Sequence, residues 1–330
     1  MRRLAGPFTA IAAFLMGLVL STAVSAEAAF APSLDAAEMA AVGQYGDKAA
    51  PLTVLERDGV LRVDGRGLAD AALTSLGRNR YGVEGGGELV LEPAGLRLNG
   101  ERLPRHDFGA EVEAAIRAAV RADPVALRAR ALAATPPVET APHRPADLVD
   151  LSTLSPTIRF DIRYAGTDNF MGLALYERPA AYLQRPAAEA LARAAKALEA
   201  QGYGVLIHDA YRPWFVTWMF WEATPPDSRV FVADPAKGSR HNRGCAVDLT
   251  LYDLKTGDPV RMPSRYDEMS DRSYADFIGG TTRQRAMRAM LRDAMVAQGF
   301  EIYPEEWWHF DYKDWRDYGI GTRTFTELAR

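Results

Sequence analysis

Short runs of alternating apolar and polar residues fill much of the N-terminal third of the chain. Residues 52–57 and 60–64 are two such runs, and the turn sequence Arg57-Asp58-Gly59 joins them. A second turn sequence, Asn99-Gly100-Glu101, follows further along. Alternation with a period of two predicts strands, and turn residues of this kind predict hairpins. Residues 108–131 then switch to helical spacing with many alanines. We therefore predict a small antiparallel β domain that ends in a helix.

A stretch rich in proline and threonine at residues 134–145 predicts a linker, and a different pattern follows it. Residues 185–201 have the spacing of an amphipathic helix, and residues 283–298 form a second helical run that Gly299 ends. We expect the arginines of the second run to form a solvated helix face. Apolar or alternating runs predict strands at residues 158–164, 203–208, 245–252, 300–303 and 309–312. The combination predicts an α+β domain with a mixed or antiparallel sheet.

The first 26 residues differ from the rest of the chain. Arg2 and Arg3 precede an apolar run at residues 8–20, and Val24-Ser25-Ala26 has the small residues of a cleavage site. This order is typical of a secretory signal peptide. An uncleaved membrane anchor is the alternative, but the apolar run is short for a transmembrane helix. We expect an exported protein, periplasmic or secreted, with no stable membrane span after cleavage.

The patterns divide the chain into four segments. The 330 residues are enough for two folded domains. The formal net charge of −4 argues against a nucleic-acid partner, because phosphate binding requires a basic face. The single cysteine, Cys245, is expected to be a small buried residue, with thiolate ligation of a metal as the alternative. The segments are a signal peptide at 1–26, a small β-rich accessory domain ending in a helix at 27–135, a linker at 136–146 and a second domain at 147–330.

Three short segments of the second domain carry candidate chemistry. Two imidazoles and one carboxylate, from His241, His309 and Asp248, are the ligand set of a catalytic zinc site whose fourth position stays open. Glu306 lies three residues before the last histidine and is suited to act as a general base. The pattern therefore predicts one zinc ion per chain in a metal-dependent hydrolase. The segments are residues 209–213, 238–248 and 303–309.

These segments resemble the zinc D-alanyl-D-alanine dipeptidases, the VanX-type branch of a wider family of zinc D,D-peptidases. The resemblance rests on S-x-H-x-x-G-x-A-x-D from Ser239, on E-W-W-H from Glu306, and on D-x-Y-R-P from Asp209. Weaker matches cover residues 164–170 and 264–267. The segments occur in family order throughout the second domain. The resemblance implies a zinc D,D-peptidase-like fold there, and it does not cover the N-terminal third.

The resemblance also implies catalytic roles. His241, Asp248 and His309 would hold the zinc ion, which would activate a water molecule. Glu306 would take a proton from that water and later deliver it to the leaving amine. Arg212 would stabilise the oxyanion that forms on the substrate carbonyl group.

For the substrate, the resemblance implies hydrolysis of the D-Ala-D-Ala dipeptide to two D-alanines. Ser239 would hold the substrate carboxylate, and Asp267 with help from Tyr164 would bind the free amino terminus. A pocket with charge partners at both ends would exclude longer chains. The alternatives are a D,D-carboxypeptidase that acts on peptidoglycan stem peptides and a zinc-containing binding protein without catalysis.

The expected location bears on the biological role. An exported enzyme does not easily reach a cytoplasmic pool of D-Ala-D-Ala. We therefore expect a role in the salvage or turnover of dipeptide released from the cell wall. The sequence assigns no role to the β domain.

Overall fold

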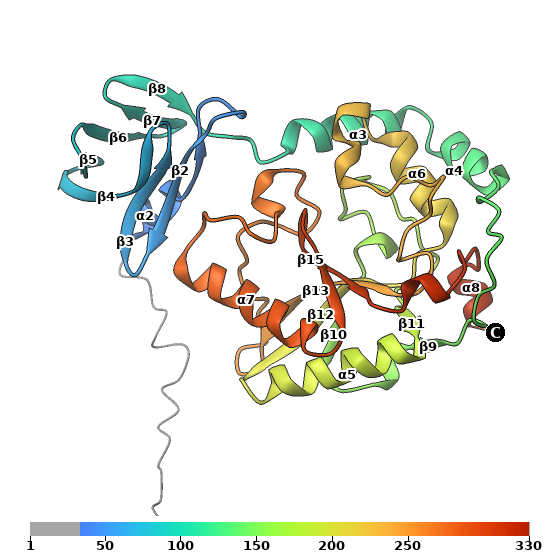
Figure 1. Ribbon diagram of the computed structural model, residues 1–330. Coiled ribbons are helices and arrows are strands. Elements are labelled where there is room, and N and C mark those ends of the chain that lie inside the picture. Colours follow the sequence, from blue (N-terminus) through green and yellow to red (C-terminus); the bar gives the residue numbers. More distant parts are fainter. Residues whose placement is uncertain (1–33, 330) are drawn as a thin grey trace, which may run out of the picture. The chain divides into compact units, whose positions relative to one another are not determined.

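The computed structural model describes residues 34–329 and combines helices with two larger sheets (Figure 1). The predicted signal peptide at residues 1–26 lies outside the described residues. Within the described part, no helix has the length and apolar character needed to cross a membrane. The buried apolar side chains form two clusters, one within an N-terminal sheet and one within the C-terminal domain.

The N-terminal part is an eight-stranded antiparallel sheet in which each strand pairs with the next along the chain. Two of its hairpins close where both central turn residues have positive φ, at Asp58 and Gly59 (52° and 82°) and at Asn99 and Gly100 (51° and 85°). Aspartate, asparagine and glycine are the residues that most readily adopt this conformation, so the turn sequences set both hairpins. The elements are α2 (Ala36–Ala41), β1 (Gly43–Tyr45), β2 (Leu52–Arg57), β3 (Val60–Gly65), β4 (Leu68–Gly77), β5 (Arg80–Val83), β6 (Glu88–Glu92), β7 (Gly95–Leu98) and β8 (Glu101–Pro104).

Two helices follow this sheet where the sequence pattern predicted one. α3 (Ala110–Ala122) ends before Pro124, which begins α4 (Pro124–Ala133) because proline lacks the N–H that would continue the first helix. Ile116 of α3 and Leu127 of α4 belong to the core of the C-terminal domain and not to the core of the sheet. These two helices therefore contribute to the core of the C-terminal domain, whereas the sequence pattern grouped a helix with the β domain.

The C-terminal domain is built on a five-stranded sheet with strand order β10-β12-β13-β15-β14. β10 runs parallel to β12, and the other neighbours are antiparallel, so the mixed helix-and-sheet class predicted from the sequence is confirmed. Almost every residue of β12 and β13 is buried. β9 and β11 pair with each other in a separate, antiparallel two-stranded sheet. The strands are β9 (Leu148–Asp150), β10 (Ile158–Phe160), β11 (Tyr182–Gln184), β12 (Tyr203–Asp209), β13 (Ala246–Asp253), β14 (Phe300–Tyr303) and β15 (Glu306–Tyr312).

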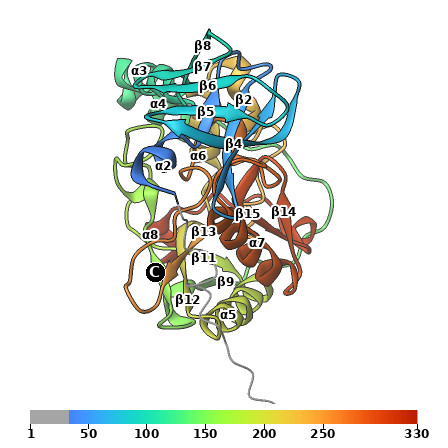
Figure 2. The same cartoon turned by 90° about the vertical axis from the view of Figure 1, so that its left-hand side faces the viewer.

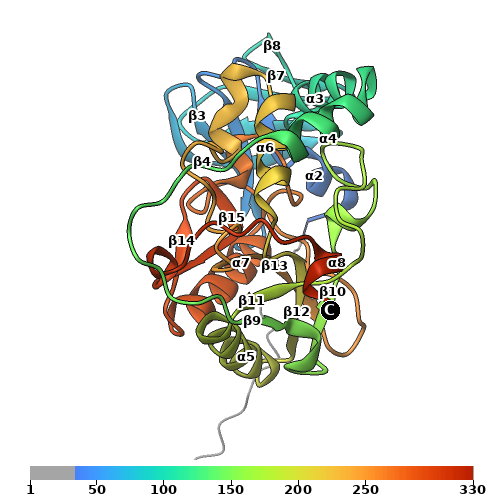
Figure 3. The ribbon, with the colours of Figure 1, turned by 90° about the vertical axis from the view of Figure 1, so that its right-hand side faces the viewer.

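Helices pack on this sheet and on one another. α5 and α7 contact each other and the strands (Figure 2), whereas α6 packs against α3 and α4 (Figure 3). Along β13, apolar Val247 and Leu249 alternate with Asp248 and Thr250, so one face of the strand is apolar and the other carries polar groups. The helices are α5 (Arg185–Glu199), α6 (Trp214–Ala223), α7 (Thr282–Val296) and α8 (Phe325–Leu328), with 3-10 turns at Leu151–Thr153, Arg163–Ala165, Pro226–Phe231, Asp271–Ser273 and Trp315–Asp317.

Two arginines of α7 depart from the solvated face that the sequence pattern suggested. Arg288 is only 8% exposed and donates to the carbonyl oxygens of Tyr274 (3.1 Å) and Phe277 (2.8 Å). Arg285 donates to the carbonyl oxygen of Glu56 (2.7 Å). These guanidinium groups satisfy backbone acceptors in loops, a use that charge spacing along a helix does not distinguish from solvation.

Candidate active site

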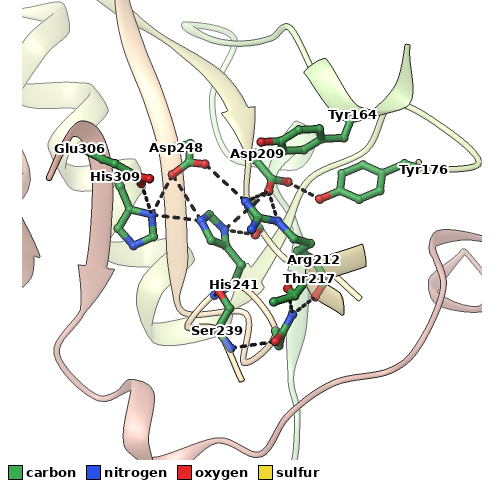
Figure 4. Close-up of polar contacts among 12 residues, drawn as sticks. Tyr164, Tyr176, Asp209, Arg212, Thr217, Ser239, His241, Asp248, Glu306 and His309 are labelled. Carbon is green, nitrogen blue, oxygen red and sulfur yellow. Dashed lines mark hydrogen bonds and ion pairs between the residues drawn. The ribbon is translucent and has the colours of Figure 1, made fainter. Parts of the chain in front are cut away.

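Three side chains converge on one face of the mixed sheet: His241, Asp248 and His309 (Figure 4). Asp248 on β13 and His309 on β15 lie directly opposite each other in the antiparallel pairing, so both side chains leave the same face. His241 comes from the loop before β13. Asp248 Oδ1 is 2.9 Å from His309 Nδ1 and 3.3 Å from His241 Nε2, and those two nitrogens are 3.1 Å apart. All three residues are buried.

Acceptors on the far side of each ring fix the orientation of both imidazoles. His241 Nδ1 lies 2.6 Å from the carbonyl oxygen of Ala210. Because a carbonyl only accepts, Nδ1 donates to it, and Nε2 is the nitrogen that faces Asp248 and His309. His309 Nε2 lies 2.9 Å from Asp311 Oδ1, which leaves Nδ1 directed at His241 and Asp248. Metal-binding histidines are commonly held in this way.

The two oxygens of Asp248 have different partners. The hydroxyl of Tyr266 donates to Oδ2 at 2.9 Å, and Arg212 Nη2 lies 3.7 Å from the same oxygen. Oδ1 is thereby left beside the two imidazoles. Burial alone would raise the pKa of Asp248, but His241 and His309 outweigh it and hold the pKa well below its usual value. The carboxylate is therefore ionised and suited to bind a cation.

Arg212 is buried next to this group and is held by Asp209 (Figure 4). Its Nε and Nη2 lie 2.9 and 2.8 Å from Asp209 Oδ2, and the hydroxyl of Tyr176 donates to Oδ1 at 2.6 Å. The rings of Phe220 and Tyr164 lie 4.7 and 5.4 Å from the guanidinium carbon. Burial raises the pKa of Asp209, and the charge of Arg212 opposes that effect. These contacts fix the guanidinium in one orientation.

Glu306 reaches the group through an irregularity in the sheet. The pairing of β14 with β15 shifts register after Ile302, so that Tyr303 pairs with Glu306. Glu306 Oε2 consequently lies 3.7 Å from His309 Nδ1, although a spacing of three residues would place the two side chains on opposite faces of a regular strand. Burial raises the pKa of Glu306 to about 7, with His309 opposing the shift and Asp248 adding to it. A base with such a pKa is suited to proton transfer near neutral pH.

The residues predicted to bind substrate, Asp267, Tyr164 and Ser239, line the same cavity as the three metal-binding candidates. The Tyr164 hydroxyl donates to Asp267 Oδ2 at 2.8 Å. Burial raises the pKa of Asp267 well above its usual value, and the charge of Asp248 adds to this. Asp267 also has a φ of 58°, which is uncommon outside glycine. Ser239 Oγ accepts from the N–H of His241 at 3.1 Å, so its own proton is left for another acceptor.

Two cavities meet at Asp267. The first, of about 90 Å³, contains the three metal-binding candidates and has an apolar edge formed by residues 230–233. The second, of about 470 Å³, is lined in part by polar residues that include His208 and Thr250. Asp267 and Phe170 line both spaces. The carboxylate of Asp267 therefore stands at the boundary between a small cavity and a larger one.

The donor atoms of this site fit one zinc ion. Ligands about 2.0–2.1 Å from a tetrahedral zinc ion lie roughly 3.3 Å from one another. The three separations among Asp248, His241 and His309 are 2.9–3.3 Å. The carboxylates of Asp248 and Asp311 are both buried here, and buried charges in proteins are paired or bind metal ions.

Four contributors to this site were not predicted: Asp209, Tyr176, Tyr266 and Asp311. Asp311 had a sequence signal, because it follows His309 by two residues in a strand and so shares its face. Asp209 and Tyr266 lie within segments that carry the family resemblance, but the spacing within those segments does not indicate their contacts. Tyr176 meets Asp209 from a loop 33 positions away, and its sequence neighbourhood has no signal for this contact.

Peptidases that use a catalytic zinc ion combine three protein ligands with an acid–base residue close by. The arrangement around His241 provides both, and it defines the class as a metallopeptidase. The sequence profile of one such family, described as D-Ala-D-Ala dipeptidase, matches residues 144–327, and the chain belongs to that family.

Individual relatives have the same description. The chain is 36% identical to the D-alanyl-D-alanine dipeptidase of Escherichia coli over 165 residues, which cover 50% of this chain and 84% of the relative. It is 36% identical to the enzyme of that name from Enterococcus faecium over 178 residues, 48% of this chain and 87% of the relative. A Streptomyces coelicolor D-alanyl-D-alanine dipeptidase is 33% identical over 186 residues, with coverage of 51% and 92%.

Proposed function

We propose that this metallopeptidase hydrolyses the dipeptide D-Ala-D-Ala to two D-alanines, with one zinc ion held by His241, Asp248 and His309. The observation that carries the proposal is the convergence of these three donors, with Glu306 lying 3.7 Å from the nearest ring nitrogen. The names of the relatives support the choice of substrate.

Glu306 is the proton-transfer group in this proposal. A zinc ion at the site would act as a Lewis acid and lower the pKa of water. Glu306 would take a proton from the attacking water at Oε2 and deliver it to the leaving amine. Its pKa of about 7 suits both transfers, because the carboxyl group accepts and releases a proton near neutral pH.

Arg212 would stabilise negative charge on the substrate carbonyl oxygen as the tetrahedral intermediate forms. The Asp209 carboxylate accepts from Nε and lies within ion-pair distance of Nη2. The guanidinium is therefore oriented before substrate arrives, so little reorganisation accompanies the reaction. Loss of one such donor typically lowers kcat by about 10²–10³-fold.

The ends of the dipeptide would be held by groups on two sides of the cavity. Asp267, fixed by the Tyr164 hydroxyl, would pair with the substrate ammonium group. That pairing would lower the pKa of Asp267 back toward its usual range, because an adjacent cation favours the ionised carboxylate. Ser239 would donate its remaining proton to the substrate carboxylate.

One observation favours a second candidate, a D,D-carboxypeptidase that acts on peptidoglycan stem peptides. The larger cavity lies beyond Asp267, and that residue lines both spaces. A substrate with residues before D-Ala-D-Ala could extend into the larger space if Asp267 did not cap an amino terminus. In a dipeptidase Asp267 would bind the substrate amino terminus, whereas in a carboxypeptidase it would let the substrate extend into the larger cavity.

Substrate comparison separates the candidates. The measurement is kcat/KM of the zinc-loaded protein and of Asp267→Asn for D-Ala-D-Ala, N-acetyl-D-Ala-D-Ala and a stem pentapeptide. A dipeptidase should cleave the acetylated compound at least about a hundredfold less well, since loss of one partner of a buried charged pair costs about 3–5 kcal/mol. Asp267→Asn should reduce the difference in kcat/KM between the free and the acetylated dipeptide. Equal cleavage of free and acetylated dipeptide would favour the carboxypeptidase, and no cleavage of any compound would favour a zinc-containing binding protein.

We also propose that the mature enzyme is exported and serves salvage or turnover of dipeptide released from the cell wall. The support is the order of charged, apolar and small residues in positions 1–26. The N-terminal sequence of protein isolated from the periplasm or medium should begin at Glu27. Full-length protein found only in the membrane fraction would instead indicate a retained anchor.

A further inference from the structure

The connector between α4 and β9 contains no helix or strand (Figure 3), and two of its residues contact the C-terminal domain. Its Arg144 donates a backbone hydrogen bond to the carbonyl oxygen of Asp317 (2.7 Å) and pairs with the Asp317 carboxylate at 2.8 Å. Earlier in the connector, the Glu139 side chain is 22% exposed. Residues 136–146 were predicted to be a linker, and these contacts attach that linker to the domain that follows it.

Glu139 contacts two segments that are distant from it in the sequence. One carboxylate oxygen lies 2.7 Å from Nη2 of Arg243, and the other accepts from the N–H of Ile320 at 2.7 Å. Burial alone would raise the pKa of Glu139, but these two contacts outweigh it and lower the pKa. A single ionised carboxylate therefore joins three parts of the chain: the connector, the loop that contains Arg243, and a C-terminal segment at residues 318–321.

Arg243 lies two residues after His241, in the loop that supplies this metal-binding candidate. It is 8% exposed, and it donates to the carbonyl oxygen of Tyr318 in the C-terminal segment. Its own carbonyl oxygen accepts from Gln184 at 2.9 Å. Because Arg243 is buried, its charge needs a nearby counterion, and the partly exposed Glu139 is the carboxylate that lies against it.

The C-terminal segment also packs directly on the same loop. The N–H of Gly321 donates to the carbonyl oxygen of Asn242 at 2.8 Å. At the start of the loop, Gly238 has a φ of 71°, and a Cβ there would lie 2.5 Å from Cδ1 of Ile320. The loop and the C-terminal segment thus fit closely, and Glu139 holds both at their junction.

We propose that Glu139 is a positioning residue for the metal site, because it ties the loop of His241 to the connector and to the C-terminal segment. The inference rests on the proposed zinc site, and it concerns a residue outside the region matched by the family profile, which begins at residue 144. It predicts that the connector is part of the functional peptidase unit.

The test uses the full chain with Glu139→Ala and the milder Glu139→Gln, which keeps an acceptor for Ile320. Arg144→Ala is the matched control, since it loosens the connector without touching the loop. Hydrogen–deuterium exchange of residues 238–245 should become faster in both Glu139 variants and stay unchanged in the control. Their zinc dissociation constants, measured by chelator competition, should rise about tenfold, the lower end of the range for residues that support metal ligands.

A double-mutant cycle adds a second readout. Glu139→Ala and Arg243→Ala combined should weaken zinc binding by less than the sum of the single effects, because the two side chains act as a pair. Unchanged loop exchange and zinc affinity in both Glu139 variants would overturn the inference, as would the same changes in Arg144→Ala. Neither the exchange measurement nor the zinc measurement depends on catalysis. If the wild-type protein did not cleave D-Ala-D-Ala, the proposed activity would be refuted. The role of Glu139 would still be decided by loop exchange and zinc affinity.

Discussion

The carboxylate of Asp311 lies 2.9 Å from Nε2 of His309, on the side of the ring opposite the nitrogen that faces Asp248. Asp311 is ionised, because His309 and other nearby cations outweigh the effect of burial and lower its pKa. A carboxylate in this position holds the ring in one orientation and makes the other nitrogen a stronger ligand. Asp311 would therefore support the proposed metal site although it supplies none of its three ligand atoms.

Asp311→Asn should weaken zinc binding by about 10–100-fold, the usual effect of removing such a partner. The change keeps the shape of the side chain but removes its charge. Glu301→Gln is a suitable control, since Glu301 is the exposed cross-strand neighbour of Asp311. Zinc affinity is measured by competition with a chelator of known strength. Equal affinities for Asp311→Asn and the control would contradict the role given to Asp311.

Tyr266→Phe tests the partner of Asp248. The hydroxyl of Tyr266 donates to Oδ2 of a buried, ionised carboxylate at 2.9 Å, and the ring stacks on His208 with centroids 4.6 Å apart. Phenylalanine keeps the stacking and removes the hydrogen bond. Because hydrogen bonds to charged groups contribute about 1.5–3 kcal/mol, the free energy of unfolding should fall by that amount in urea titrations of metal-free protein. A change within experimental error would mean that the bond contributes nothing to stability.

Local pattern predicted the elements that carry the site better than the contacts among them. The run at residues 245–252 predicted a strand, and β13 (Ala246–Asp253) is that strand, with Asp248 and Thr250 on its polar face. The strand that carries His309 begins three residues earlier than predicted, at Glu306, because the register shift beside Tyr303 starts a new pairing there. A bulge of this kind depends on the partner strand, so one strand's sequence does not reveal it.

The sequence patterns did not predict polar contacts between residues that are far apart in the chain. The connector was predicted as a linker from its prolines and threonines, and that composition does not show that Glu139 meets Arg243 more than a hundred positions away. Nor did arginine spacing in α7 show that Arg288 is buried against loop carbonyl oxygens. Such contacts depend on how distant segments pack, which hydrophobic periodicity does not specify.

Cys245 should be unreactive in the folded protein. It is fully buried, its Sγ lies 3.6 Å from the carbonyl oxygen of Arg243, and burial raises the pKa of the thiol to about 12. The thiolate is the reactive form, so a neutral-pH thiol reagent should modify almost none of the native protein and one equivalent after denaturation. Rapid modification of the native protein would contradict the burial of Cys245, because it would mean that the thiol is accessible.

The pair formed by Glu139 and Arg243 should make stability depend on pH. Glu139 has a lowered pKa in the folded protein, with Arg243, the Ile320 N–H and His143 as the groups that favour its ionised form. A carboxyl group with a lowered pKa stabilises the fold above its unfolded pKa, and that contribution is lost as pH falls through the folded value.

Glu139→Gln should therefore be less stable than the wild type by about 1.5–3 kcal/mol near pH 7, the scale of a hydrogen bond to a charged group. The difference should shrink steadily as pH is lowered below about 4.5, the usual pKa of a glutamate. Urea unfolding at a series of pH values measures it. A difference that stays constant down to acid pH would show that the charge of Glu139 is not what stabilises the fold.

Glu306→Gln, compared with the wild type for zinc content and for turnover of D-Ala-D-Ala, tests the central claim most directly. We expect about one zinc ion per chain in both proteins, because Glu306 is not among the three ligands. We expect kcat to be lower by at least about a hundredfold in the variant, since general-base catalysis contributes about 10²–10⁴-fold. Near-normal turnover in zinc-loaded Glu306→Gln would contradict the account, and Glu305→Gln would then be examined as the alternative base.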